Sequence, residues 1–278
     1  MKIQLAKSAG FCFGVKRALD IAFQTAQKKS CVLMLGDIVH NEEVIASIRE
    51  AGVKKIKSLK AGQNKTLLIR AHGMSLSTLK KAKNAGYEII DATCPMVKEI
   101  HHIARRMEEE GFRIIIIGDK HHDEVRGIVG QLKNKALVID AIDHIPWKAL
   151  LSIKKAAVVV QSTQNFQKVK KIVGLLRKRI KRLKFFNTIC GPTRTKQKEI
   201  ESMARAFDVM IVIGSKTSAN TRRLYEIAKS LNKRTYRVES KKNIRREWIK
   251  GAERIGVTAG ASTPQATTQE IITFLENL

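Results

Sequence analysis

Residues 94–118 read CPMVKEIHHIARRMEEEGFRIIIIG, which is a cysteine, a helical pattern and a short apolar run that ends in glycine. From Val97 to Met107 apolar residues recur at intervals of three or four, as on one face of a helix. The run from Ile114 to Ile117 is β-branched throughout and predicts a buried strand. This stretch decides the fold because its plan occurs three times in the chain.

The repeated plan fixes the spacing between a cysteine and a glycine. A strand-like stretch leads to each cysteine, and helix-like runs follow at residues 15–27, 96–110 and 195–207. The next apolar run then ends in glycine. The offset is 24 residues in every repeat, from Cys12 to Gly36, from Cys94 to Gly118 and from Cys190 to Gly214.

Polar residues keep the same register in the three repeats. Four residues after the glycines stand His40, His122 and Ser218, and six residues after them stand Glu42, Glu124 and Asn220. Each repeat then has another apolar run that ends in a polar turn, at residues 67–73, 158–163 and 255–262. The side chains at these turns are therefore candidates for one shared site.

Alternating strands and helices predict an α/β fold with parallel sheets, in which ligand groups gather beyond the carboxyl ends of the strands. We expect three similar α/β units, at residues 14–94, at residues 95–188, and at residues 189–278 together with 1–13. Units of this size bury little core alone, so we expect a pseudo-threefold arrangement. Equivalent loops would then bring Cys12, Cys94 and Cys190 together at the centre.

The composition is that of a globular cytoplasmic protein. Hydrophobic residues make up 44% of the 278 residues, and no apolar run is long enough to span a bilayer. The N-terminal residues MKIQL lack the apolar core of a secretory signal, which favours the cytoplasm. Disulfides are not expected in that compartment, so the four cysteines call for another explanation.

The charge is strongly positive, with 53 Lys and Arg against 25 Asp and Glu, or +28. It favours an anionic partner, either a nucleic acid, an acidic protein or a phosphorylated substrate, unless it is only a basic background. Aromatic residues are 5% of the chain, and no helix-turn-helix, finger or base-stacking motif accompanies the charge. Nucleic-acid binding is therefore disfavoured.

Cys12, Cys94 and Cys190 each stand just before a helix-like run, where the helix dipole and unpaired amides favour a thiolate. Three thiolates suit either zinc with a fourth ligand or an iron-sulfur cube with one open iron. The plainer alternative, three unrelated buried cysteines, does not explain the shared offset. Cys31 falls outside the pattern and is interpreted as a small core residue.

The histidines at strand-to-turn junctions suggest an anion site. His40, His72 and His122, with Ser218, Asn220 and Ser262, offer hydrogen-bond donors suited to a diphosphate. Neither a P-loop pattern nor G-x-G-x-x-G is present, so nucleotide binding by those routes is unsupported. Glu124 could relay a proton, although a solvent-facing glutamate at a helix start is the simpler alternative.

Seven ordered motifs resemble those of the 4-hydroxy-3-methylbut-2-enyl diphosphate reductase family. The resemblance covers essentially the whole chain. The motifs are Gly10–Val15, Val39–Asn41, Ala71–Gly73, Asp91–Pro95, His122–Val125, Thr188–Cys190 and Gly260–Pro264.

The resemblance implies a trefoil-like fold around a 4Fe-4S cluster held by Cys12, Cys94 and Cys190. It also implies reductive dehydroxylation of an isoprenoid diphosphate to isopentenyl and dimethylallyl diphosphates, with Glu124 as proton donor. The hydroxyl residue that assists this glutamate in the family aligns with Ser162. The hydroxyl of the neighbouring Thr163 could fill the same role. The implied substrate-binding residues are His40, His72, His122, Ser162, Ser218, Ala219, Asn220 and Ser262.

The chain departs from the family pattern at three places. Asp123 replaces a usual proline, and its charge is expected to raise the proton affinity of Glu124. Ala219 replaces a serine and removes one phosphate hydroxyl, and Gly191-Pro192-Thr193 replaces the usual residues after Cys190. None of these changes removes a cysteine, so they bear on substrate affinity more than on reaction type.

No flavin or nicotinamide motif is present, so an external one-electron donor such as ferredoxin or flavodoxin is implied. Two rival functions remain open at this point. One is a basic nucleic-acid-binding protein with a structural zinc, which iron analysis would exclude. The other is a non-catalytic iron-sulfur electron carrier, which would bind no isoprenoid diphosphate.

Overall fold

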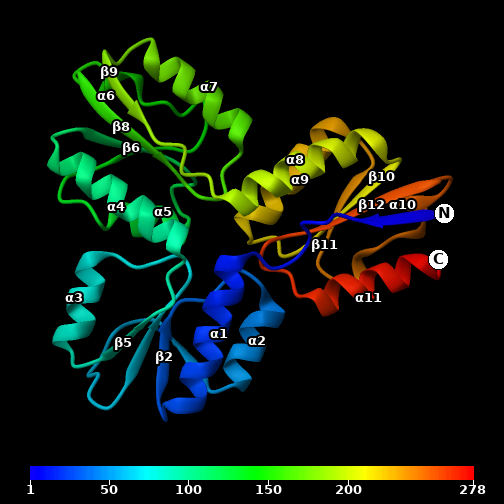
Figure 1. Cartoon of the computed structure of the whole chain (residues 1–278), viewed down its shortest axis with the longest axis horizontal. Helices are drawn as coiled ribbons and strands as arrows, with labels where there is room; N and C mark the ends of the chain where they lie inside the picture. Colours follow the sequence, from blue (N-terminus) through cyan, green and yellow to red (C-terminus); the bar gives the residue numbers. More distant parts are fainter. The chain divides into compact units, whose positions relative to one another are not determined.

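The computed structural model describes all of residues 1–278 and alternates strands with helices along the chain (Figure 1). Its strands form three four-stranded sheets, and each strand is parallel to the neighbours it pairs with. The predicted α/β fold with parallel sheets is therefore confirmed.

The first sheet has the order β3-β2-β4-β5. Its central strands β2 and β4 are largely buried, and the edge strands β3 and β5 are more exposed. The strands are β2 (Val32–Leu35), β3 (Val53–Ile56), β4 (Thr66–Ile69) and β5 (Glu88–Asp91), and the helices in this part of the chain are α1 (Phe13–Lys28), α2 (Glu42–Glu50) and α3 (Leu76–Asn84).

The second sheet has the order β7-β6-β8-β9. Its strands are β6 (Arg113–Ile117), β7 (Leu137–Ile139), β8 (Lys155–Val160) and β9 (Arg182–Phe185), and its helices are α4 (Pro95–Glu109), α5 (Asp123–Val129), α6 (Trp147–Leu150) and α7 (Phe166–Arg177). Alternate residues of β6 face opposite cores: Ile115 packs with residues of α7, and Ile116 packs with residues of α4 and α5. Both faces are covered, which explains the continuous apolar sequence of β6.

The third sheet has the order β1-β12-β10-β11 and joins the two ends of the chain. The blue N-terminal strand lies beside β12 in Figure 1, with Ile3 opposite Ile255. The strands are β1 (Lys2–Leu5), β10 (Val209–Ile213), β11 (Thr235–Val238) and β12 (Arg254–Ala259), and the helices are α8 (Gly191–Ala206), α9 (Ala219–Leu231), η1 (Lys241–Asn243), α10 (Arg246–Ile249) and α11 (Gln265–Glu276).

The repeated glycines end the central strands for a steric reason. Gly36 and Gly214 have φ values of +89° and +141°, a region that side chains rarely enter. Gly118 has an ordinary φ, but a Cβ there would lie 2.7 Å from a methyl of Val125 on α5. Each sharp turn lets the chain leave the strand and enter the next polar loop.

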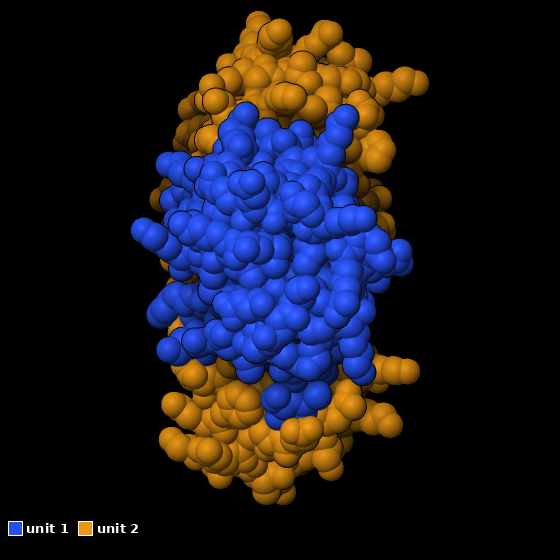
Figure 2. Space-filling view, turned by 90° about the vertical axis from the view of Figure 1, so that its right-hand side faces the viewer, with its two compact units in different colours: residues 1–16, 39–47, 191–278 blue, residues 17–38, 48–190 orange.

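Contacts group the chain into two compact units, coloured separately in Figure 2. We call Met1–Lys16, Val39–Ser47 and Gly191–Leu278 the terminal unit, and Arg17–Ile38 with Ile48–Cys190 the middle unit. The terminal unit holds the third sheet, and the middle unit holds the other two. The three domain ranges expected from the repeat, and their pseudo-threefold arrangement, stay predictions.

Two details of the sequence interpretation are wrong. The third repeat's helix was expected from residue 195, but α8 begins at Gly191, because Pro192 is well tolerated in the first turn of a helix. Cys31 was expected in the core, but it is only half-buried, just before β2. No helix combines the length and apolar composition of a membrane span.

Candidate functional site

The three repeated cysteines occupy equivalent places in their sheets. The backbone N–H of Cys12 donates to the carbonyl of Ala261 at 3.2 Å. The N–H groups of Cys94 and Cys190 donate at 3.0 Å to the carbonyls of Ala71 and Ser162. All three acceptors stand two residues beyond the end of a strand, β12, β4 or β8. The common spacing in the sequence therefore reflects a common backbone geometry.

Each of these cysteines is half-buried and directly precedes a long helix, α1, α4 or α8. At Cys12 the sulfur accepts the Val15 N–H at 3.5 Å, a contact of the first turn of α1. Helix N-termini stabilise a thiolate, and partial exposure leaves it accessible to a ligand. The donor set suits a metal that prefers thiolates, such as zinc or the iron of an iron-sulfur cluster.

In the middle unit, His72 and His122 face each other edge to face. Their ring centroids are 5.3 Å apart at an interplanar angle of 88°. His72 follows Ala71, the acceptor of the Cys94 N–H, and His122 begins α5. Two imidazoles in contact at the start of α5 can offer ring N–H groups to an anion.

His122 is also the N-cap of α5. Its Nδ1 accepts the backbone N–H of Glu124 at 3.2 Å. The proton of the neutral ring therefore belongs on Nε2, which leaves that nitrogen as a hydrogen-bond donor. A donor at this position suits a phosphate oxygen better than a metal ion.

Glu124 is 2% exposed, and its carboxylate is bound by Ser162, which follows the end of strand β8. Its Oε1 accepts the Ser162 N–H at 2.6 Å, and its Oε2 accepts the Ser162 hydroxyl at 2.7 Å. Burial raises the pKa of Glu124, and the Asp119 charge raises it further, although the two bonds from Ser162 act in the opposite direction. The simpler alternative, a solvent-facing glutamate, is therefore wrong.

Ser162 connects Glu124 to Cys190. Its N–H and hydroxyl bind the carboxylate, and its carbonyl accepts the Cys190 N–H at 3.0 Å. Thr163 instead accepts a bond from Gln161 Nε2 at 3.1 Å. Of the two hydroxyls left open by the sequence, Ser162 is the one that contacts Glu124.

Asp123 does not have the expected effect of raising the pKa of Glu124. Its Oδ2 lies 2.6 Å from a guanidinium nitrogen of Arg70, at the end of β4, so its charge is compensated. The nearby carboxylate that raises the pKa of Glu124 is Asp119. The departure from the family pattern thus creates an ion pair between the residue after β4 and the first residue of α5, both in the middle unit.

The terminal unit gathers a second group of predicted residues. The Ser262 hydroxyl donates to the His40 carbonyl at 3.2 Å, and Ser262 follows Ala261, the acceptor of the Cys12 N–H. Ser218 caps α9 by accepting the Thr221 N–H at 3.3 Å. Ala219, next along the helix, is buried and offers no side-chain donor.

Asn220 has a buried amide donor without a partner. The residue is 4% exposed, and its Nδ2 makes no hydrogen bond within the protein. Such an orphaned group is costly in a folded protein unless a ligand or water satisfies it. Its place in the first turn of α9 makes an anion the natural acceptor.

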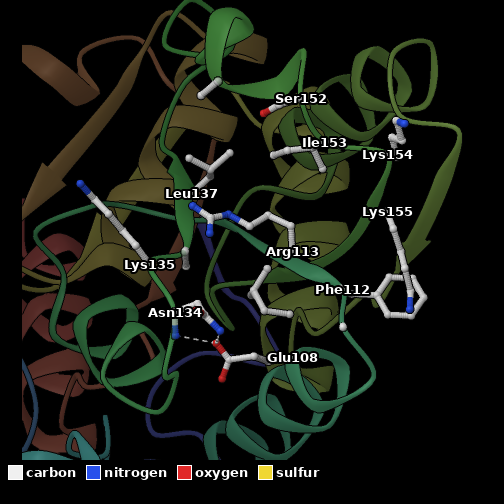
Figure 3. A pocket seen from close by; sticks show the side chains of 14 residues that line it. Glu108, Phe112, Arg113, Asn134, Lys135, Leu137, Ser152, Ile153, Lys154 and Lys155 are labelled. Atoms are coloured by element: carbon white, nitrogen blue, oxygen red, sulfur yellow. Dashed lines mark hydrogen bonds between the residues drawn. The ribbon is translucent and has the colours of Figure 1, made fainter.

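One cavity lies at the other end of the second sheet. It measures about 660 Å³ and is lined by Arg113, Leu137 and Lys155, which begin β6, β7 and β8, and by Glu108 and Phe112 (Figure 3). Glu124 and Ser162 follow the carboxyl ends of β6 and β8. This cavity is therefore separate from the candidate site.

Comparison with known proteins gives the family. Residues 3–276 match the LytB protein family. This chain belongs to that family. A 4-hydroxy-3-methylbut-2-enyl diphosphate reductase of Geobacter metallireducens is 40% identical over 272 residues, or 98% of this chain and 96% of the relative. The reductase of the same name from Clostridioides difficile is 37% identical and covers 100% of both chains.

Two solved structures are also similar to this chain. The structure of (E)-4-hydroxy-3-methyl-but-2-enyl diphosphate reductase, described as the terminal enzyme of the non-mevalonate pathway, is 36% identical with a TM-score of 0.73. It covers 100% of this chain and 99% of its own. The Plasmodium falciparum E-1-hydroxy-2-methyl-but-2-enyl-4-diphosphate reductase is 26% identical with a TM-score of 0.91, over 99% of this chain and 88% of its own.

Sequence reasoning missed several buried or half-buried charged residues of this LytB protein. Arg70 pairs with Asp123, and Lys196 and Glu199 of α8 bind the loop before Cys12. Burial lowers the pKa of Lys196 to about 8, against the opposing effects of Cys12 and Glu199. None of these side chains belongs to a family motif quoted above, and their partners are distant in sequence.

His101 of this LytB protein lies behind the loop that carries His72. It is 6% exposed, and its Nε2 makes no hydrogen bond. A Cβ on Gly73 would lie 2.8 Å from its ring, so the glycine makes room for it. Burial lowers the pKa of His101 to about 4, and Arg105 contributes in the same direction.

This histidine predicts a pH dependence of stability. Its pKa falls from 6.5 in the unfolded chain to about 4 in the folded protein, so its contribution is present above pH 6.5 and is lost as the pH falls towards 4. Between pH 7 and pH 5 we expect the wild type to lose about 2 kcal/mol more unfolding free energy than His101→Leu. Urea titrations of the cluster-free proteins measure this. His102→Leu, at an exposed neighbour, should keep the wild-type slope; equal slopes for wild type and His101→Leu would contradict the prediction.

Proposed function

We propose that this chain reduces 4-hydroxy-3-methylbut-2-enyl diphosphate to isopentenyl and dimethylallyl diphosphates. Two electrons and two protons enter, the carbon–oxygen bond of the hydroxymethyl group breaks, and the oxygen leaves as water. Similarity over the whole length to reductases of this name supports the reaction. The observation that carries it is the buried Glu124, joined through Ser162 to the backbone of Cys190.

The proposed cofactor is a 4Fe-4S cluster with Cys12, Cys94 and Cys190 as its protein ligands. Three half-buried cysteines at helix N-termini, with matched backbone hydrogen bonds, fit its need for thiolates. When bound, such a cluster supplies electrons and one iron without a protein ligand, which acts as a Lewis acid towards the substrate hydroxyl. Zinc in place of iron would contradict this assignment.

Glu124 is proposed as the proton donor to the departing oxygen. A carboxyl with a raised pKa is protonated in a larger share of molecules near neutral pH, which an acid catalyst requires. Ser162 binds both carboxyl oxygens, so the carboxyl group is held in one orientation. The second proton joins either end of the allylic group, which yields the two products.

The diphosphate is proposed to bind the donors at the strand ends. In the middle unit these are His72 and His122, the latter through Nε2. In the terminal unit they are His40, Ser218, Asn220 and Ser262. The unpartnered Asn220 amide supports this role because a phosphate oxygen would satisfy it. Ala219 contributes only its backbone N–H.

The proposed electron donor is a small acidic ferredoxin or flavodoxin of the cytoplasm. The net charge of +28 would steer an acidic partner towards this protein. A reducing compartment also suits three cysteines that must stay available as thiolates.

Steering predicts a salt-sensitive rate. With a ferredoxin as donor, turnover should fall about tenfold or more between low and physiological ionic strength, because salt screens the attraction. With a small chemical reductant in the same buffers, the rate should change little. Steady-state assays with both donors measure this, and an equally flat response to salt would mean that the charge is only background basicity.

The reaction itself is tested under anaerobic conditions. Protein reconstituted with iron and sulfide is mixed with the substrate and a chemical one-electron reductant, and the products are separated by chromatography. We expect both five-carbon diphosphates and two electrons consumed per substrate. A protein that holds the cluster yet leaves the substrate intact would instead be an electron carrier.

A further inference from the structure

Two side chains of α8, Glu199 and Lys196, form hydrogen bonds with the loop that leads to Cys12. Glu199 accepts the Lys7 N–H on Oε1 at 2.6 Å and the Ser8 N–H on Oε2 at 2.9 Å, and the Ser8 hydroxyl also donates to Oε2. These three donors satisfy both carboxylate oxygens. The backbone after β1 is therefore tied to α8 and not only to its own sheet.

Lys196 lies one turn earlier on α8 and binds the same loop from inside. It is 3% exposed, and its ammonium donates to the carbonyls of Ser8, Gly10 at 3.0 Å and Ala259 at 3.3 Å. Three acceptors match the three N–H groups of an ammonium, which lets the charge stay buried.

The acceptors of Lys196 come from two segments next to Cys12, the loop after β1 and the last residue of β12. Gly10 stands two residues before Cys12, and Ala259 ends β12 two residues before Ala261, the acceptor of the Cys12 N–H. Lys196 thus holds the loop that leads to Cys12 against the end of β12.

The same ammonium acts on the sulfur through its charge. Lys196 donates to the carbonyl of Gly10, two residues before Cys12, so its positive charge lies beside the segment that carries the sulfur. A Cys12 thiolate and the ammonium would therefore stabilise each other. A buried charge is screened far less by salt and water than one of the many exposed lysines. Moreover, α8 follows Cys190 directly in the chain, so one helix is linked to two of the proposed ligands.

We propose that Lys196 and Glu199 are positioning residues for the proposed cofactor: the pair fixes the Cys12 loop, and the Lys196 charge favours the reduced, more negative form of the cluster. This inference rests on the proposed function. Lys196 and Glu199 have separable effects, because only Lys196 supplies positive charge.

The first test compares Lys196→Met with Lys196→Arg and with Lys198→Met, a control at an exposed position of the same helix. After anaerobic reconstitution, redox titration gives the midpoint potential, and an iron chelator gives the rate of cluster loss. We expect Lys196→Met to have a lower potential and to lose its cluster about tenfold faster. Lys196→Arg should recover most of the potential, and Lys198→Met should match the wild type. A wild-type potential in Lys196→Met would overturn the charge effect.

The second test uses Glu199→Gln, which keeps the Lys196 charge but offers one acceptor oxygen instead of two. In the cluster-free protein we expect hydrogen exchange at the Lys7 and Ser8 amides to be about tenfold faster, and in the loaded protein faster cluster loss at a nearly unchanged potential. Unchanged exchange would overturn the positioning role, even if Lys196→Met fails to fold. Wild-type protein that takes up no iron would contradict the proposed function itself. The hydrogen-exchange experiment uses cluster-free protein, so it tests the hydrogen bonds between Glu199 and the loop independently of the proposed function.

Discussion

Glu124→Gln is expected to lower turnover about a thousandfold, because the amide has no acidic proton to give to the departing oxygen. The variant keeps the size of the side chain and an acceptor for the Ser162 donors, so it should fold and retain iron and sulfide. Product formation under anaerobic conditions, normalised to iron content, measures the effect.

A matched control is Glu109→Gln, an exposed glutamate at the end of α4. It should turn over at the wild-type rate. Normal activity of Glu124→Gln would remove Glu124 from the mechanism, whereas loss of iron in that variant would assign the glutamate to folding or cofactor retention.

Cys94→Ser is expected to abolish the iron-sulfur absorbance and nearly all turnover, since serine replaces a thiolate by a much poorer ligand for iron. Iron and acid-labile sulfide should fall from about four of each per chain in the wild type to a small fraction of that value. Colorimetric iron and sulfide assays with a visible spectrum measure the change.

Cys31→Ser provides the control for this experiment. Cys31 is half-buried like the other three cysteines, but it precedes β2 rather than a helix. Its replacement should leave iron, sulfide and turnover unchanged. A full cluster in Cys94→Ser, or an equal loss in Cys31→Ser, would show that the repeat does not identify the ligands.

Much of the fold could be predicted from the sequence because the repeat preserves topology as well as spacing. The equal offsets from Cys12, Cys94 and Cys190 correspond to one backbone arrangement, a cysteine N–H bound to the turn after the neighbouring strand. The short edge strands gave no such signal: β7 has only 3 residues, and its apolar pattern is too brief to distinguish a strand from a loop.

The candidate site was predictable in its residue types but not in its contacts. Ser162 and Thr163 are adjacent hydroxyls, and only the direction of the backbone after β8 decides that Ser162 meets Glu124. The sequence does not reveal that the charge of Asp123 is paired, because its partner Arg70 is 53 residues away. The hydrogen bond between Ser8 and Glu199 joins residues that are 191 positions apart, a separation at which a single sequence carries no pairing information.

The central claim is that three cysteines from separate repeats hold one cluster and leave one iron for the substrate. Mössbauer spectroscopy of protein loaded with ⁵⁷Fe, before and after the substrate is added, tests it most directly. We predict that about one iron in four gives a distinct signal, and that this signal alone shifts when the substrate binds. Four equivalent irons that do not respond to substrate, or a protein that binds zinc and no iron, would contradict the claim.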